Sequence, residues 1–168
     1  MTSAELLADS FGRIRDAVHE AVEDLAVDAL MARLDAEANS IGWLVWHLTR
    51  VQDDHVAAVA GTSQVWMSSG WAKRCGLPFD ESDHGYGHGT AEVAAVNLDA
   101  ATLLGYHDAV CDATLRFIGQ LTDADLDRVV DERWDPPVTL AVRLVSVVAD
   151  DLQHAGQAAF IRGILTRR

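Results

Sequence analysis

Apolar residues recur at helical spacing along most of the chain. In the N-terminal segment they step by three or four positions, which places them on one face of a long amphipathic helix. This stripe consists of Leu7, Phe11, Ile14, Val18, Val22 and Leu25. Residues 28–38 are less regular and predict a crossing loop with one turn of helix. Signals for β-strands are nearly absent, so the pattern predicts an all-α protein.

A second helix is predicted from residue 41 to residue 60. Asn39 or Ser40 can cap its start, because both side chains accept hydrogen bonds from free backbone N–H groups. Gly61 is placed as its C-terminal stop. The insert that follows, residues 61–89, is long, irregular and rich in Gly, Ser and aromatic side chains. Such a loop in a compact domain is usually functional or disordered, and its aromatic residues argue against disorder.

A third helix is predicted over residues 98–121, and a fourth from about residue 139 to residue 165. Pro136 and Pro137 exclude helix at the end of the connector between them. Four helices of this length predict a four-helix bundle, with the long insert between the second and third helices. No segment has the composition of a linker, so we expect a single helical domain over residues 1–168.

Composition narrows the classes of function. Apolar residue types make up 49% of the chain and charged types 23%, which is typical of a globular protein. The net charge of −13 disfavours nucleic acid and anionic membranes as partners. The N-terminus lacks an apolar signal segment, and no run of 18 apolar residues occurs. Cys75 and Cys111 form no zinc-ribbon or disulfide framework, so we expect reduced thiols in a cytoplasmic protein.

The predicted second helix carries a histidine inside an apolar run. His47 is the polar residue of the segment IGWLVWHL. An imidazole in such surroundings is costly unless it is hydrogen-bonded or ligated. His47 is therefore either a core histidine that donates to a backbone carbonyl, or a ligand.

The predicted fourth helix carries a second polar group of residues. Asp150 and His154 are four positions apart, so they stack on one face, and Gln157 lies near that face. A histidine and a carboxylate on a rigid helix form half of a site for a divalent metal, and His47 is the natural third ligand from a facing helix. The alternative is an Asp150–His154 ion pair on a wet surface.

The remaining candidates give weaker signals. His55 lies about 80° around the helix from His47, so we expect it to be solvated and outside that site. His84 and His88 lie in the Gly-rich segment DHGYGHG, where they could cover a pocket or donate to a ligand, or simply be surface residues. We expect His19 and His107 to lie on helix surfaces or to serve ordinary packing, and Cys111 to be a core residue rather than a nucleophile. The serine-hydrolase, phosphate-loop and H-E-x-x-H motifs do not occur.

Two helical segments resemble a known family. The segments NSIGWLVWHLTRVQDDHVAAVAG and DDLQHAGQAAFIRG are similar to the second and fourth helices of the DinB/YfiT-like superfamily. The insert, with QVW, GWAKRCGLPFD and GYGHG, resembles an actinobacterial-type branch of it. The resemblance extends from about residue 5 to residue 165. It implies a four-helix bundle with a divalent metal (Zn, Ni, Mn or Fe) held by His47, Asp150 and His154.

The Asp150 position departs from the usual family pattern, which has histidine there. Aspartate is still a competent ligand, and it hardens the site toward Mn, Fe or Ni relative to three histidines. Gln157 is then placed to orient a bound water or ligand.

The resemblance also implies an activity. Characterised relatives are metal-dependent S-transferases or isomerases that use a low-molecular-weight thiol such as mycothiol or bacillithiol. A metal with three protein ligands keeps positions for a thiol, whose pKa falls on coordination. The insert would shape a pocket for a small electrophile, with apolar walls from Trp66, Trp71 and Tyr86, and His84 or His88 could move protons there.

Two other classes of function stay open. The chain could be a bacterial stress-related bundle that binds a metal or small molecule without catalysis. It could also be a helical interaction protein in which His47, Asp150 and His154 make only hydrogen bonds. Bundles of this kind commonly associate through their helix faces, so a homodimer is compatible with the sequence.

Overall fold

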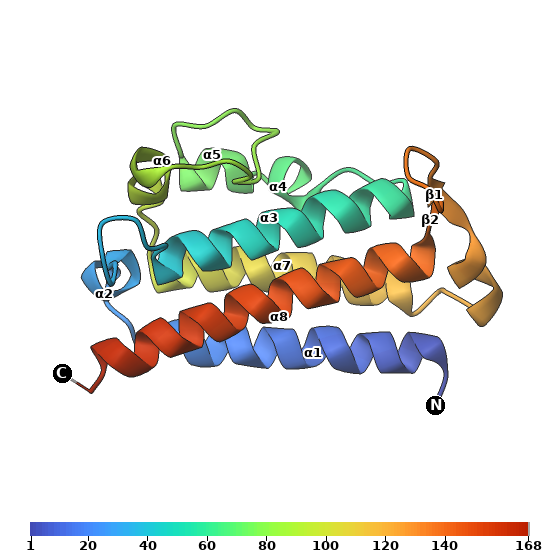
Figure 1. Cartoon of the computed structure of the whole chain (residues 1–168), viewed down its shortest axis with the longest axis horizontal. Helices are drawn as coiled ribbons and strands as arrows, with labels where there is room; N and C mark the ends of the chain where they lie inside the picture. Colours follow the sequence, from blue (N-terminus) through green and yellow to red (C-terminus); the bar gives the residue numbers. More distant parts are fainter. Residues whose placement is uncertain (168) are drawn as a thin grey trace.

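Four long helices dominate the computed structural model, which describes residues 1–167 of the chain (Figure 1). They are α1 (Ser3–Val22), α3 (Ile41–Ala60), α7 (Ala100–Ile118) and α8 (Leu140–Leu165). Helix α8 packs against both α3 and α1, and α7 packs against the same two helices from the other side. The prediction of an all-α four-helix bundle is confirmed.

Shorter elements connect these helices. They are α2 (Val27–Met31), α4 (Val65–Ser68), α5 (Trp71–Cys75), α6 (Thr90–Ala95), the 3-10 helix η1 (Asp123–Asp127), β1 (Val129–Asp131) and β2 (Val138–Thr139). The insert therefore contains two short helices, where we expected irregular chain throughout. The antiparallel pair of β1 and β2 was also not expected, because strands of three and two residues are too short to show alternation. In Figure 1 the insert lies along α3, and the β-hairpin lies where α8 begins.

A serine side chain and a glycine set the two ends of α3. Ser40, rather than Asn39, accepts a hydrogen bond from the backbone N–H of Trp43. Gly61 ends the helix with φ +67°, a left-handed conformation in which a side chain is strained.

Two of the long helices are shorter than predicted. The Asp99 side chain accepts from the backbone N–H of Thr102, so α7 begins at Ala100, two residues later than expected. Helix α1 ends at Val22. Leu25, the last residue of the predicted stripe, lies beyond the helix but still packs against the core.

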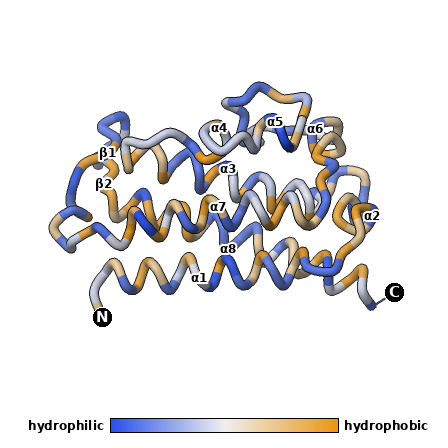
Figure 2. Tube along the Cα trace, turned by 180° about the vertical axis from the view of Figure 1, so that it is seen from behind, coloured by the Kyte–Doolittle hydropathy of each residue, from blue (hydrophilic) through white to orange (hydrophobic). Residues whose placement is uncertain are grey.

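Helix α3 is the most enclosed element of the bundle. Apolar and polar segments alternate along α1 in Figure 2, as expected for a helix with one wet face. By contrast, every residue from Ile41 to Asp53 is buried, since the insert covers the side of α3 that the other long helices leave open. Polar side chains in this stretch therefore need partners inside the protein. No helix within residues 1–167 is both long and apolar enough to cross a membrane.

Candidate metal centre

The three predicted ligands lie together between α3 and α8. One potential ligand atom from each of His47, Asp150 and His154 lies within 4.8 Å of the other two. The two imidazole rings meet edge to face, with their centroids 4.9 Å apart. The distance from His154 Nε2 to Asp150 Oδ1 is 3.7 Å. Helices far apart in sequence thus bring three donors to one point, which we call the metal cluster.

The ring of His47 is fixed by two contacts. Its Nδ1–H donates to the backbone carbonyl of His84. Trp43, one turn earlier on α3, stacks on the ring at 4.7 Å between centroids and 11° between planes. The carbonyl contact is the one expected for a core histidine, but it also leaves the Nε2 lone pair available, as in most metal-binding histidines.

The ring of His154 is oriented in the same way. Its Nδ1 lies 3.0 Å from Gln157 Oε1, which can only accept, so this nitrogen carries the proton. Its Nε2 is therefore also a free lone pair. The side chains of His154 and Asp150 are only 19% and 25% exposed, which does not fit an ion pair on a wet surface.

Asp150 completes a set of acceptors. Its Oδ2 atom is buried and has no hydrogen-bond partner among the residues that the structure describes. Burial lowers the pKa of His47, the hydrogen bond to His84 offsets part of this, and His154 lowers the pKa further, so His47 is neutral at pH 7. The ring nitrogens of His47 and His154 that make no hydrogen bond then lie beside the carboxyl group of Asp150. Such a set fits a divalent cation, and two histidines with one carboxylate leave coordination positions open for a ligand.

The insert reaches the metal cluster through a glycine. At Gly85 the φ angle is +98°, and a Cβ atom there would lie 2.7 Å from His47 Nδ1. Only glycine therefore brings the preceding carbonyl, that of His84, onto the histidine ring. The sequence analysis missed this residue, although the run GYGHG signalled unusual backbone conformations.

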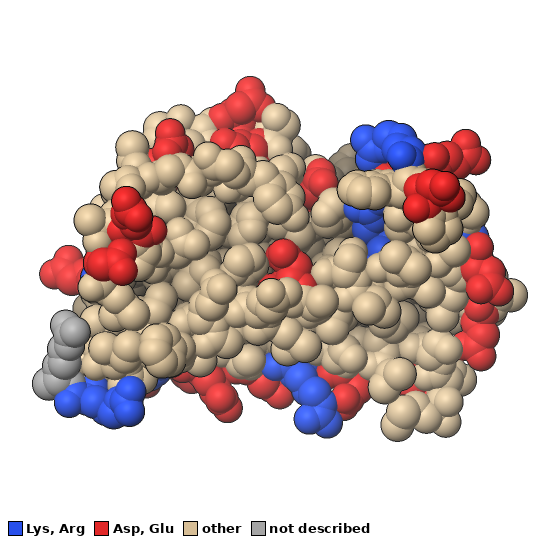
Figure 3. Space-filling model, in the orientation of Figure 1, with Lys and Arg blue, Asp and Glu red and all other residues tan. Residues whose placement is uncertain are grey.

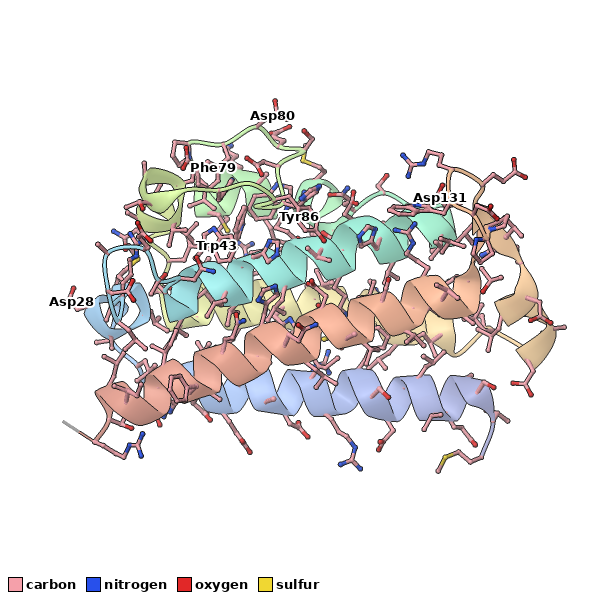
Figure 4. The ribbon with its side chains drawn as sticks, viewed as in Figure 1. Asp28, Trp43, Phe79, Asp80, Tyr86 and Asp131 are labelled. Carbon is pink, nitrogen blue, oxygen red and sulfur yellow. The ribbon has the colours of Figure 1, made fainter. Side chains whose placement is uncertain are left out.

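Tyr86 and His84 lie at the mouth of the cluster. The ring of Tyr86 meets the ring of His47 edge to face at 5.4 Å, while the residue is 60% exposed (Figure 4). The ring of His84 lies 4.7 Å from that of Tyr86, and its Nδ1 has no partner among residues 1–167. Of the two histidines of the insert, His84 is thus the one whose ring keeps a buried nitrogen without a hydrogen-bond partner in residues 1–167.

His88 has a different role. Its Nδ1 accepts from the indole N–H of Trp43 at 3.1 Å, and its Nε2–H donates to Asp83 Oδ2 at 3.0 Å. Both ring nitrogens are occupied, so His88 anchors the insert on α3.

The expected aromatic pocket walls are only partly found. Trp66 and Trp71 are 4% and 8% exposed, and both pack against the buried ring of Tyr106, at 5.0 and 5.8 Å. They belong to the core beneath the insert, because aromatic residues of a folded loop can be buried on its inner side. Tyr86 is the one of the three predicted walls that contacts the metal cluster.

A buried charge pair on α3 holds the insert in place. Arg50, whose side chain is fully buried, donates to the backbone carbonyls of Asp83 and Glu81. The carboxylate of Asp53 accepts from two backbone N–H groups at the start of α4. The sequence analysis did not recognise this pair, although two charges within a largely apolar helix are unusual.

Comparisons with known proteins agree with this architecture. The family described as "Mycothiol-S-transferase", a DinB-like family, matches residues 6–167. A crystal structure of a conserved protein from Enterococcus faecalis is 27% identical, with a TM-score of 0.92, over 100% of this chain and 99% of that chain. No curated protein gives a significant match. The expected DinB-like resemblance is confirmed, and the chain belongs to the mycothiol-S-transferase family.

Proposed function

We propose that this protein is a divalent-metal-dependent S-transferase that joins a low-molecular-weight thiol to a small electrophile. His47, Asp150 and His154 are the proposed ligands, and mycothiol is the proposed thiol because of the family. The observation that carries the proposal is the convergence of two imidazole nitrogens and one carboxylate oxygen within 4.8 Å of one another. The metal is proposed to be Zn, Ni, Mn or Fe, all of which accept imidazole and carboxylate ligands.

The bound ion would supply Lewis acidity, which lowers the pKa of a thiol so that a nucleophilic thiolate exists at neutral pH. This chemistry needs no protein cysteine. Burial raises the pKa of both Cys75 and Cys111 to about 11, so neither is a thiolate at neutral pH.

The protein's own residues position the reaction. The His84 carbonyl and the Gln157 side chain hold the two imidazoles with Nε2 toward the centre. Tyr86 gives the open side of the centre an aromatic edge against which an electrophile can pack. The free Nδ1 of His84 is the group proposed to move a proton there.

Metal analysis and a conjugation assay test the proposal together. Wild type supplied with Zn, Ni or Mn should bind about one ion per chain and conjugate mycothiol to an aryl halide. His154→Ala should lose both properties. His19→Ala is the control, because His19 lies on α1 and bonds to Asp108, and it should keep both.

Two results would contradict the proposal. Absence of stoichiometric metal in supplemented wild type would reject the site, and would favour a bundle in which these residues only form hydrogen bonds. Bound metal without turnover of any thiol would reject the enzyme, and would favour a non-catalytic binding protein.

A further inference from the structure

A second pocket lies beside the metal cluster, between the end of α3, the β-hairpin and the start of α8. Its volume is about 480 Å³. In Figure 3 a hollow separates the lobe formed by the insert from the lobe formed by the hairpin, and basic groups line its hairpin side. The charged and titratable residues that line the pocket are Asp54, His55, Arg128, Asp131, Arg133 and Arg143.

The pocket is locally cationic in an acidic protein. Three guanidinium groups outnumber its two carboxylates, while the whole chain has a net charge of −13. Arg128 donates to the backbone carbonyl of Val59 and, within the part of the chain that is described, pairs with no carboxylate. A local excess of positive charge attracts an anion, and an excess of one charge suits a monoanion.

Arg143 is held in place before any ligand arrives. Its side chain is 18% exposed, and its Nη2 donates to Asp131 Oδ2 at 3.1 Å. Its Nη1 donates to His55 Nδ1 at 3.0 Å. His55 therefore accepts at Nδ1 and carries its proton on Nε2, which is a second donor. Burial, followed by the charge of Arg143, lowers the pKa of His55 and keeps it in this neutral form.

The pocket and the metal cluster lie on the same faces of α3 and α8. Arg143 precedes Asp150 by seven residues on α8, and Asp54 follows His47 by seven residues on α3. Seven residues are two helical turns, so each pair shares a helix face at an axial separation of about 10 Å. The two helices run in opposite directions, so both offsets lead the same way (Figure 1).

Tyr86 lies at the metal-cluster side of this surface. Its ring meets that of His47 edge to face, with the centroids 5.4 Å apart. In Figure 4 Tyr86 lies on the insert side of this face and Asp131 on the hairpin side.

We propose that the second pocket binds a carboxylate group of the electrophilic substrate. The donors are the guanidinium of Arg143 and Nε2–H of His55, with Arg128 at the rim. A planar guanidinium matches the geometry of a carboxylate, and the single excess charge suits one carboxylate better than a phosphate dianion. The assignment to the substrate of an S-transferase rests on the proposed function, whereas the carboxylate site itself does not.

The test compares two probes that differ only in charge, 4-chloro-3-nitrobenzoate and 4-chloro-3-nitrobenzamide. Calorimetry on the metal-free protein should show that the benzoate binds wild type about tenfold more tightly than the amide. In Arg143→Gln the two probes should bind equally. Arg13→Gln, which removes an exposed arginine paired with Asp9 on α1, should retain the tenfold difference.

Turnover separates this proposal from the proposed function. With metal and thiol present, Arg143→Gln should raise KM for the benzoate about tenfold and leave kcat, and KM for the amide, unchanged. A carboxylate preference in a protein that shows no metal or turnover would reject the S-transferase function and keep the carboxylate site.

Three results would overturn the carboxylate site. They are equal binding of the two probes by wild type, a tenfold preference that survives in folded Arg143→Gln, and displacement of the benzoate by inorganic phosphate at a lower concentration than by acetate. If circular dichroism shows that Arg143→Gln is unfolded, the binding comparison is repeated with Arg128→Gln, and with wild type at two salt concentrations. The Arg128→Gln substitution should reduce the preference for the benzoate, and so should raising NaCl from about 0.05 M to about 1 M.

Discussion

Two buried histidine clusters lie on opposite faces of α3, and they differ in where their protons are. The metal cluster (His47, Asp150, His154) faces α8. The second, which we call the α7 cluster, consists of Thr49, His107 and Cys111. Residues two positions apart on a helix point about 200° apart, so His47 and Thr49 belong to different sides of one element.

The polar groups of the α7 cluster have their hydrogen-bond partners within the cluster and its own helix backbone. Thr49 donates its hydroxyl proton to a backbone carbonyl at 2.7 Å and accepts from His107 Nδ1–H at 3.1 Å. His107 Nε2 then accepts from the thiol of Cys111, at 3.4 Å. Burial lowers the pKa of His107 to about 3 and raises that of Cys111 to about 11, so both groups are neutral. No lone pair of the imidazole is left for a ligand.

The metal cluster has the opposite property. The single N–H of each imidazole donates to an acceptor outside the cluster. For His47 the acceptor is the His84 carbonyl, and for His154 it is the side chain of Gln157. The nitrogens that face Asp150 therefore carry only lone pairs. Burial alone does not separate a histidine with both ring nitrogens hydrogen-bonded from one that keeps a free lone pair, since His47 and His107 are 3% and 0% exposed. The two histidines differ in whether the second ring nitrogen has a hydrogen-bond partner.

The largest expected effect is stabilisation by metal. At a free Zn²⁺ concentration about 1,000 times its Kd, the free energy of unfolding of wild type should rise by about 4 kcal/mol, because the ion binds only the folded site. His154→Ala should show no rise at the same concentration. His107→Gln, from the α7 cluster, should show the full rise from a lower baseline. Urea unfolding with and without Zn²⁺ measures all three, and an equal rise in His154→Ala would place the ion elsewhere.

The free energy of unfolding should depend on His107 of the α7 cluster as the pH falls. Since the folded pKa of His107 lies near 3, below the unfolded value of about 6.5, the unfolded chain takes up the proton first as pH falls. The contribution of His107 to stability is complete above about pH 6.5 and is lost below it, by about 1.4 kcal/mol per pH unit. Raised carboxyl pKa values, as at buried Asp151, act in the opposite direction.

The difference between wild type and His107→Gln isolates this contribution. Between about pH 6.5 and about pH 4.5 the stability of metal-free wild type should fall by about 2 kcal/mol more than that of the variant. Urea unfolding at intermediate pH values measures the difference. Parallel pH curves for the two proteins would mean that His107 is protonated in the fold, and that the α7 cluster is not closed.

A pair of glycines tests how the insert supports the metal cluster. Gly85 and Gly87 have φ angles of +98° and +79°, so alanine strains the backbone at both. Only at Gly85 would the new Cβ collide with His47, while no atom lies within 4 Å at Gly87. Gly85→Ala should therefore weaken metal binding by about 2 kcal/mol, comparable to the loss of an outer contact of a metal ligand.

Gly87→Ala should leave the metal affinity unchanged, although it loses about 1 kcal/mol of stability from the same backbone strain. Competition with a chromogenic chelator gives the affinities. Equal affinities for the two variants would show that contact between the insert and His47 does not matter to the site.

The sequence predicted the helices and the three facing donors because both depend on local spacing. The step of three or four residues from Leu7 to Val22 marks α1, and the spacing of Asp150 and His154 on apolar flanks marks one half of the metal cluster. For His47, an imidazole inside an apolar run, the sequence left a core histidine as the alternative, and the family resemblance favoured the ligand.

Features that depend on distant chain segments could not be predicted in this way. The His84 carbonyl reaches His47 from 37 residues away, and Arg143 reaches His55 from 88 residues away. Neither contact leaves a period in the sequence. Trp66 illustrates the same limit, because its apolar character predicts burial but not the side of the insert on which it is buried.

The smallest expected effect concerns the outer support of His154. Gln157→Leu removes the acceptor of His154 Nδ1–H, which then has no fixed orientation, and metal affinity should fall about tenfold. Gln153→Leu is the matched control, because this exposed glutamine, one turn earlier, donates to the backbone carbonyl of Ala149 on its own helix. Equal affinities in the two variants would mean that the orientation of His154 comes from packing. The contrast with the α7 cluster would then rest on His47 and Asp150, since the protonated nitrogen of His154 would no longer be fixed by a partner.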